Sequence, residues 1–306
     1  MSTRQTSLGS VAAAILAVPA MALAQPAPAD NSIDQRVRQV QGAILEDAAR
    51  QESILTGRDD IVLIRRRQFF TVSAAAAVLD TTNAALSTDA NGDQFATLDV
   101  SLRAATVLGG RVDVYAEAGA STAQYRRFES LGYVAVSGAL GAHSRVWGVD
   151  LDATYTPNII FDHEADERQL TQHRVSLGLA RAIRLRNLSI RADAGLERIW
   201  ADPSPYSNTG ASIGLSLATP LTSDGRLTGF ASIRGVGRNY DNYFEAFVGT
   251  PRRDRLLEGS LGLSYALTRR ASLEVRWTQS RNWSSSDVNR WQGGVGSLGI
   301  RTALRF

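Results

Sequence analysis

Residues 257–283, LEGSLGLSYALTRRASLEVRWTQSRNW, decide the fold class of this chain. Apolar and polar side chains largely alternate over 257–265 and again over 273–278, and a short connection at 267–270 separates the two runs. In an extended strand successive side chains point to opposite faces, so each run has one apolar face and one polar face. The pattern predicts two antiparallel strands joined by a short turn.

The same alternation recurs from about residue 67 to the last residue. We expect about twelve strands, near residues 67–80, 94–107, 111–122, 132–140, 145–156, 169–180, 187–200, 209–219, 226–238, 254–267, 271–282 and 290–306. Short turns, expected at 108–110, 141–144, 181–186, 220–225 and 267–270, alternate with longer polar loops. Barrels of the outer membrane combine an even strand number with this rhythm. The sequence therefore predicts an all-β fold, a transmembrane antiparallel up-and-down β-barrel with a short periplasmic helix before it.

Aromatic residues gather at the predicted strand ends. Those near the longer loops are Phe95, Tyr125, Tyr133, Tyr155, Trp200, Tyr206, Tyr240, Trp277, Trp283 and Trp291. Those near the opposite end are Phe69, Phe70, Trp147 and Phe306. We expect them to form two aromatic belts at the membrane interfaces.

The final strand, residues 297–306, places Leu304 and Phe306 on one apolar face. A last strand that ends in phenylalanine resembles the signal read by the bacterial barrel-assembly machinery, which we expect as a partner during biogenesis. The longest apolar run after residue 24, Phe69 to Leu79, is too short for a membrane-spanning helix. The backbone N–H and C=O groups inside a membrane would then have to form their hydrogen bonds between neighbouring strands of a closed ring.

The segment before the barrel divides into two parts. Residues 1–24 have the charge, the short apolar core (11–20) and the small residues around 22–24 that are typical of a secretory signal peptide. Residues 25–66 are expected to be a periplasmic linker followed by an amphipathic helix, and residues 67–306 the outer-membrane barrel. The helix has three open interpretations: a plug or lid at the barrel mouth, contact with a periplasmic partner, or a loosely ordered tail.

Composition excludes several classes of function. The 306 residues contain no cysteine, so disulfides, thiolate metal sites and lipid attachment to cysteine are excluded. The formal net charge of +3 gives no case for nucleic acid. Arginines dominate the expected short turns and their flanks, where they would meet anionic phospholipid headgroups. They are Arg111, Arg145, Arg181, Arg184, Arg186, Arg226, Arg269 and Arg270, with Asp224 as the one acid among them.

Charged residues also occupy the predicted inward face of the strands. We expect the pore lining to include Arg103, Asp113, Glu117, Asp150, Asp152, Arg174, Arg191, Asp193, Glu197, Arg234, Glu258, Glu274, Arg276 and Arg301. Two interpretations stay open, a water-filled lumen that steers a solute and a network of salt bridges that braces a narrow barrel.

Catalytic and metal sites are not expected. The chain has three histidines, of which His143 falls in an expected turn, His163 in the acidic segment 162–167 and His173 near a strand start. No spacing forces a catalytic pair, so we expect no enzyme, and a hydrolase at the outer rim is only a weak alternative. The acidic segment is interpreted as a solvated loop rather than a cation site, and no cofactor or metal is expected.

The region from about residue 67 resembles bacterial outer-membrane β-barrel proteins. More narrowly, the segments 253–254, 258–265, 267–270, 281–282 and 284–286 resemble putative β-barrel porins of the exopolysaccharide-export and surface-assembly type, over about a sixth of the chain. The resemblance implies transport or surface export. Such export proteins often carry a long periplasmic helical-repeat domain, whereas here one short helix precedes the barrel.

From these observations we expect a protein of the bacterial cell outer membrane, in contact with its lipid and lipopolysaccharide. Its first expected function is a porin-like channel or export conduit for a polar solute or polymer. The alternative is a non-conducting structural or surface-binding barrel.

Overall fold

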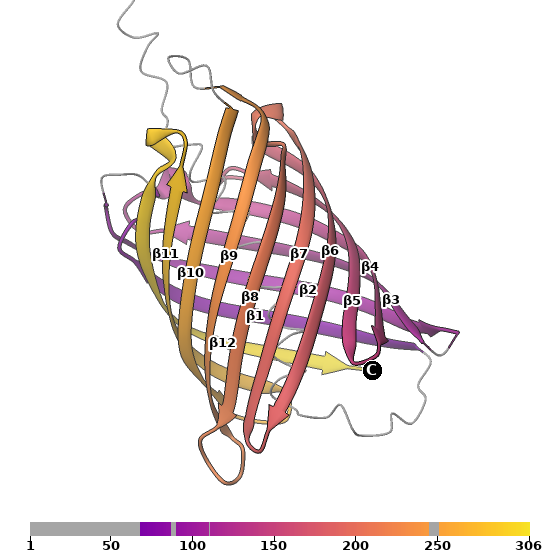
Figure 1. Cartoon of the computed structure of the whole chain (residues 1–306). Helices are drawn as coiled ribbons and strands as arrows, with labels where there is room; N and C mark the ends of the chain where they lie inside the picture. The colour runs from indigo at the N-terminus through magenta and orange to yellow at the C-terminus, as the bar shows by residue number, and fades with distance from the viewer. Residues whose placement is uncertain (1–67, 87–89, 110, 245–250) are drawn as a thin grey trace, which may run out of the picture.

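The computed structural model describes residues 68–86, 90–109, 111–244 and 251–306, so the predicted signal peptide, linker and amphipathic helix lie outside the described residues. Twelve antiparallel strands form one closed barrel in which each strand pairs with its sequence neighbours and β1 pairs with β12 (Figure 1). The prediction of an all-β closed barrel of twelve antiparallel strands is confirmed. The strands are β1 (Gln68–Thr81), β2 (Asp93–Leu108), β3 (Val112–Tyr125), β4 (Tyr133–Val146), β5 (Val149–Phe161), β6 (Arg168–Leu185), β7 (Leu188–Asp202), β8 (Asn208–Pro220), β9 (Leu227–Phe244), β10 (Pro251–Ala266), β11 (Ala271–Ser284) and β12 (Trp291–Arg305).

The two ends of the barrel differ in their connections. We call the end where β1 connects to β2 the loop end, and the end where β2 connects to β3 the turn end. The loop end lies at the top of Figure 1, and front and rear strands cross at a wide angle, as strands tilted from a barrel axis do. Three loop-end connections contain short 3-10 turns, η3 (Glu129–Leu131), η4 (Ser204–Tyr206) and η5 (Asp287–Asn289).

Two predicted turns were wrong. The strand β4 continues through residues 141–144, and the chain reverses at Trp147 and Gly148, both with positive φ (53° and 77°). Two consecutive residues with positive φ form the tight hairpin turn that matches strand twist. The strand β6 likewise continues through most of 181–186 and ends at Leu185. The glycine at 141 and the arginines of 181–186 were therefore wrongly interpreted as signs of turns, whereas both stretches belong to regular strands.

The outward faces of the strands form a continuous apolar belt. Ile213 is 68% exposed and Leu196 and Leu261 are each 61% exposed. No charged residue occupies an outward position on β2, β3, β4, β5, β8 or β12. On the remaining strands the outward charges lie near the strand ends. Such a belt is far larger than the apolar patches that soluble monomers expose.

The prediction of an aromatic belt at the loop end was wrong for half of its members. Phe95, Tyr125, Tyr133, Tyr206 and Tyr240 are each at most 8% exposed, so they are not part of the exposed belt. The exposed aromatic side chains near this end are Tyr155, Trp200, Trp277 and Trp283, and those at the turn end include Phe70, Trp147 and Phe306. The five buried aromatics share strand parity with inward residues or lie in a connection, which explains their burial.

The barrel closes between its first and last strands. The register of β1 and β12 runs from Thr71 opposite Arg305 to Thr81 opposite Val295. Beyond it, the Phe306 amide donates to the Phe70 carbonyl at 2.9 Å, and the Phe70 amide donates to the Phe306 carbonyl at 3.3 Å. Among the residues that the structure describes, no helix is long and apolar enough to cross a membrane.

Candidate functional site

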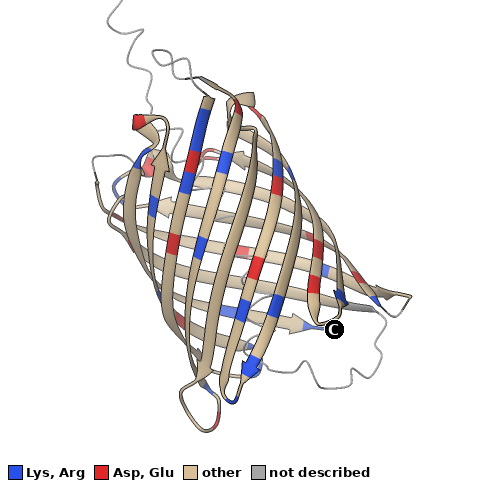
Figure 2. Ribbon diagram, in the orientation of Figure 1, with Lys and Arg blue, Asp and Glu red and all other residues tan. Residues whose placement is uncertain are grey.

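The candidate site is the charged interior of the barrel. All of the residues predicted to line a pore lie on the face of their strands opposite to the apolar belt. They are Arg103, Asp113, Glu117, Asp150, Asp152, Arg174, Arg191, Asp193, Glu197, Arg234, Glu258, Glu274, Arg276 and Arg301. Figure 2 shows acidic and basic residues distributed along the strands rather than gathered at one end.

Glu197 on β7 connects three strands. Its carboxylate binds Arg174 of β6 (Nη2–Oε2, 2.8 Å) and Arg238 of β9 (Nε–Oε1, 3.0 Å). The three side chains are at most 14% exposed. Gly210 of β8 lies between Glu197 and Arg238, and a Cβ added there would lie 2.8 Å from Glu197 Oε1. The missing side chain of Gly210 therefore lets Glu197 reach across one strand to the next, and we call this set the Glu197 triad.

The same arrangement recurs in register elsewhere on the interior wall. Asp193 of β7 lies opposite Gly214 of β8, which lies opposite Arg234 of β9. Arg234 in turn donates to Ser212 at 3.4 Å. On the far side of the barrel, Ala75 of β1 separates Asp99 of β2 from Arg301 of β12. Small residues at these positions allow acidic and basic groups to face one another across three strands.

A second charged group, the Asp150 cluster, lies near the turn end. Asp150 is 3% exposed and binds Arg145 (Nε–Oδ1, 2.6 Å) and Arg191 (Nη1–Oδ2, 3.4 Å). His143 contacts Asp152 (Nδ1–Oδ1, 2.9 Å) and lies 3.8 Å from Asp150. The expectation that His143 lies in a turn was wrong, because β4 extends past it and its side chain faces the interior. A buried carboxylate requires such charge-assisted partners.

The other predicted residues make smaller groups. Arg103 lies opposite Glu117 and its guanidinium stacks 3.7 Å from the centre of the Tyr115 ring. Glu274 binds Arg276 at 2.9 Å, and Glu258 accepts a hydrogen bond from Ser280 at 3.2 Å. Asp113, opposite His143, is exposed at the turn end.

Sequence reasoning missed one group, the Arg252 cluster at the loop end. Arg252 and Asp254 are each 1% exposed and bind one another at 2.7 Å. The Arg252 guanidinium lies 4.2 Å from the centre of the Tyr240 ring, and Asn282 donates to Asp254 at 3.3 Å. The sequence did contain a sign of this group, because residues 252, 254 and 258 are spaced at multiples of two and so share one face of β10. The group was missed because the predicted strand began only at residue 254.

The loop end of the interior is packed with side chains. One inward or loop residue at the end of each strand from β1 to β11 is at most 6% exposed. These residues are Thr81, Phe95, Tyr125, Tyr133, Ile160, Leu170, Ile199, Asn208, Tyr240, Arg252 and Ser284. Most of the apolar ones form one cluster with Leu131 of η3 and Tyr206 of η4, which we call the loop-end core. The side chains at the loop end are thus buried, whereas Asp113, Asp152 and Arg145 stay accessible toward the turn end.

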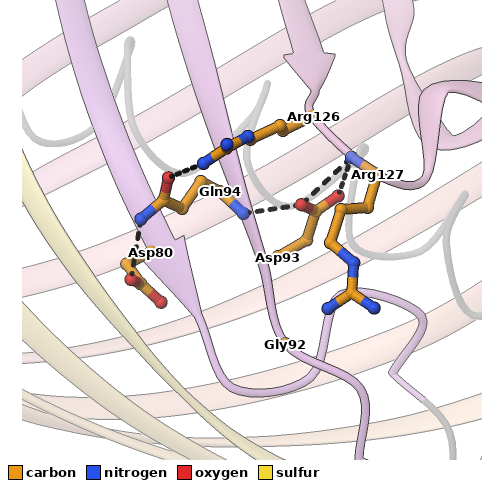
Figure 3. Close-up of a pocket in the computed structure, with 6 residues that line it drawn as sticks. All are labelled: Asp80, Gly92, Asp93, Gln94, Arg126 and Arg127. Carbon is orange, nitrogen blue, oxygen red and sulfur yellow. Dashed lines mark hydrogen bonds between the residues drawn. The ribbon is translucent and has the colours of Figure 1, made fainter.

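A small pocket of about 250 Å³ lies outside this core, at the rim formed by β1, β2 and the connection after β3 (Figure 3). Gln94 lies between Asp80 and Arg126 and hydrogen-bonds to both, at 3.4 and 3.3 Å. The Asp93 carboxylate accepts the backbone amides of Gln94, Arg127 and Phe128 at 2.8 to 3.2 Å. These bonds hold the residues that line the pocket in place.

The three histidines lie apart from one another. His163 lies 3.6 Å from Glu164 in the exposed acidic segment, and His173 faces outward and bonds the Tyr155 hydroxyl at 2.7 Å. Within the described ranges, no three histidine or acidic residues are grouped as metal ligands would be. The interior thus offers charge and hydrogen bonding, which can bind or guide a polar solute.

Comparisons with known proteins agree with the fold. No family model matches the chain, and no curated protein matches it. An outer-membrane channel from Pseudomonas putida F1 is 12% identical, with 78% of this chain and 95% of that chain covered and a TM-score of 0.51. The β-domain of the Bordetella autotransporter BrkA is 14% identical over 77% of this chain and 99% of that chain, with a TM-score of 0.49. The translocator domain of the Neisseria meningitidis autotransporter NalP is 12% identical over 84% and 94%, with a TM-score of 0.39. At 12% identity, the likeness to the Pseudomonas channel is one of fold alone.

Proposed function

We propose that this chain is a transmembrane barrel of the bacterial outer membrane that forms a narrow conduit for polar solutes, described here in its closed state. The observation that carries the proposal is the contrast between a charged interior, accessible toward the turn end, and a packed loop end. The turn end faces the periplasm and the loop end faces outward, as in barrels with short periplasmic turns.

The apolar belt supports the membrane location. Each square ångström of apolar surface in water costs roughly 25 cal/mol, so a ring of leucine, valine and isoleucine side chains strongly favours lipid. The closed sheet leaves no unpaired strand edge, which a bilayer core requires. The signal peptide expected at residues 1–24 would deliver the chain across the inner membrane.

The interior charges support the conduit. Carboxylates and guanidinium groups on opposite sides of the lumen provide exchangeable partners for a hydrated solute. The ion pairs also brace the wall, and the two roles are compatible, because the Glu197 triad and the Asp150 cluster leave Asp113 and Asp152 accessible. Opening would require the loop-end core to rearrange.

Conductance of the refolded barrel in planar bilayers tests this proposal. The wild-type protein should conduct little at rest, and Tyr133→Ala with Leu170→Ala should raise its conductance, because both side chains fill the loop-end core. Ile213→Ala, on the outward face, is the matched control and should leave conductance unchanged. If the folded double variant stays as silent as the wild type, the conduit is wrong.

The packed loop end favours a second candidate, a non-conducting barrel that binds a ligand at its outer surface. The rim pocket with Asp80, Gln94 and Arg126 is where such a ligand would bind. Two results would support this function instead. The Tyr133→Ala, Leu170→Ala variant would not conduct, and Arg126→Ala would abolish binding of a ligand at the outer surface.

Two partners complete the proposal. The barrel-assembly machinery would recognise the last strand through Leu304 and Phe306. The amphipathic helix expected within residues 25–66 would act at the periplasmic mouth or on a periplasmic protein. Deleting residues 25–66 from the Tyr133→Ala, Leu170→Ala variant separates the two roles of the helix, because removal of a plug raises conductance further and loss of a partner contact does not.

A further inference from the structure

Three arginines lie on the outward face of the barrel near the loop end, on the neighbouring strands β10 and β11. Arg253 and Arg255 share the outward side of β10, and Arg281 lies on the outward side of β11. Arg255 is opposite Trp283 and Leu257 is opposite Arg281, so Arg255 and Arg281 are diagonal neighbours. Residues two apart on one strand and diagonal cross-strand pairs are both separated by roughly 7 Å. Figure 2 shows basic residues at the loop-end start of β10.

The structure describes no acidic partner for these arginines. The outward positions of β10, β11 and β12 carry no aspartate or glutamate. In the part of the chain that the structure describes, none of the three guanidinium groups forms an ion pair. Nearby Arg198, by contrast, is bound to Asp241 on the same outer surface, and Arg290 is bound to Asp287. Among the described residues, therefore, no carboxylate neutralises these three positive charges.

The surface beside them provides open space. Gly237 lies directly opposite Arg255, and a Cβ added at Gly237 would meet no atom within 4 Å. Gly235, opposite Leu257, continues this strip, and an added Cβ there would touch only Ile213 Cγ2, at 3.8 Å. Gly237 and Gly235 thus leave a short outward strip without side chains beside the arginines, which we call the furrow.

Apolar and aromatic groups border both parts of this surface. Leu257 and Ile213 flank the furrow and are exposed. Trp283 lies beside Arg281, whose guanidinium is 4.9 Å from the centre of the indole ring. Tryptophan at this height is typical of the boundary between acyl chains and headgroups. The surface therefore offers positive charge at headgroup level directly above a groove suited to an acyl chain.

We propose that Arg253, Arg255 and Arg281 bind the phosphate of a phosphorylated glycolipid of the outer leaflet, the lipid A part of lipopolysaccharide, with one acyl chain in the furrow over Gly235 and Gly237. Guanidinium groups bind phosphate oxygens through paired, charge-assisted hydrogen bonds. The proposal rests on the membrane location and orientation proposed above, and it does not depend on whether the barrel conducts.

Native mass spectrometry of the full folded chain in uncharged detergent, with purified lipid A added, tests this site. Each arginine near an anionic lipid surface adds binding free energy, and its loss weakens binding about fivefold. The double variant Arg255→Gln, Arg281→Gln should therefore bind lipid A roughly 25-fold more weakly. Arg168→Gln is the matched control, since Arg168 is also exposed at the loop end but is bound to Asp202 at 3.2 Å. Gly237→Leu, which fills the furrow without removing charge, should weaken binding as well.

The same measurement decides against the site in two ways. Equal binding of lipid A from which both phosphates have been removed, or of phosphatidylglycerol, would overturn it, because the surface would then recognise only acyl chains or only net charge. Unchanged binding by the double variant would overturn it also. Cell fractionation tests the membrane location separately, so failure of the location and failure of this site can be distinguished.

Discussion

Phe230 on β9 lies directly opposite Gly262 on β10, and its ring occupies the space where a side chain at residue 262 would stand. A Cβ added to Gly262 would overlap that ring and would also lie 2.5 Å from the Val275 carbonyl oxygen. On the next strand, Arg276 stacks 5.1 Å from the centre of the same ring. The glycine thus allows an aromatic side chain to join three strands, as Gly210 allows for Glu197.

We expect Gly262→Ala to lower the free energy of unfolding by about 1–3 kcal/mol, because the added methyl group overpacks the wall against backbone that cannot move away. Gly237→Ala, where the new group meets open space, should change stability by less than about 0.5 kcal/mol. Urea unfolding in detergent or lipid vesicles measures both. Equal effects of the two substitutions would contradict the argument.

Glu197→Gln should destabilise the barrel by about 3–5 kcal/mol, since it leaves Arg174 and Arg238 without their shared carboxylate in a largely buried site. Glu258→Gln is a suitable comparison, because Glu258 accepts a single hydrogen bond from Ser280. That variant should lose about 1 kcal/mol. The order of the two unfolding midpoints is the measurement, and a reversed order would show that the Glu197 triad does not brace the wall.

Asp254→Asn should be as severe as the Glu197 substitution, because Arg252 would keep its charge while only 1% exposed. The partly exposed pair of Arg198 and Asp241 provides the contrast, and Asp241→Asn should cost at most about 1 kcal/mol. A temperature series on unheated gels, in which folded and unfolded barrels migrate differently, would rank the two variants. Similar midpoints would mean that burial of the Arg252 cluster contributes little.

The turn between β8 and β9 should respond to acid through Asp224. The hydrogen bond from the Thr222 hydroxyl, with the Arg226 amide, lowers the pKa of the Asp224 carboxyl below its usual value. A lowered pKa in the folded state stabilises the turn at pH values above the unfolded pKa, and this contribution disappears as the pH falls through the folded pKa. The Asp224→Asn variant should therefore be less stable than the wild type at neutral pH and equally stable in strong acid. Unfolding midpoints measured over a pH series compare the two proteins. A difference that persists in acid would rule out this cause.

Replacing Phe306 by alanine should reduce the amount of assembled barrel in cells while leaving the refolded protein nearly as stable. The backbone bonds between Phe306 and Phe70 do not depend on the side chain. Immunoblots of outer-membrane fractions and in vitro unfolding measure the two effects. Loss of stability in vitro equal to the loss in cells would indicate a packing role rather than an assembly signal.

Much of the fold follows from the two-residue period of the sequence. Parity assigns Glu117, Arg174 and Glu197 to the interior and Leu196 and Leu261 to the belt, because a strand has only two faces. The same rule should have placed Phe95, which shares parity with Asp99, in the interior. It was assigned to a belt because aromatic residues are common at membrane interfaces, whereas here the interior is itself apolar at the loop end.

Other features depend on distant neighbours and could not be predicted. Gly141 was interpreted as part of a turn, yet it lies mid-strand, where the Tyr115 ring crosses it and the hydroxyl approaches Thr154 at 3.2 Å. Nothing local to residue 141 identifies that ring. The burial of Arg252 and Asp254 likewise depends on Tyr240 and Asn282 from neighbouring strands, although their inward position follows from the two-residue period of β10.

The pairing of β1 with β12 has a kinetic consequence. These strands are the most distant in sequence, so the entropy of bringing them together must be overcome before their hydrogen bonds can form. Until β1 and β12 pair, the unfinished sheet has two strands with unpaired backbone groups, and each of them can pair with the corresponding strand of another copy. A chain with this topology would therefore need a chaperone that covers β1 and β12 until they pair.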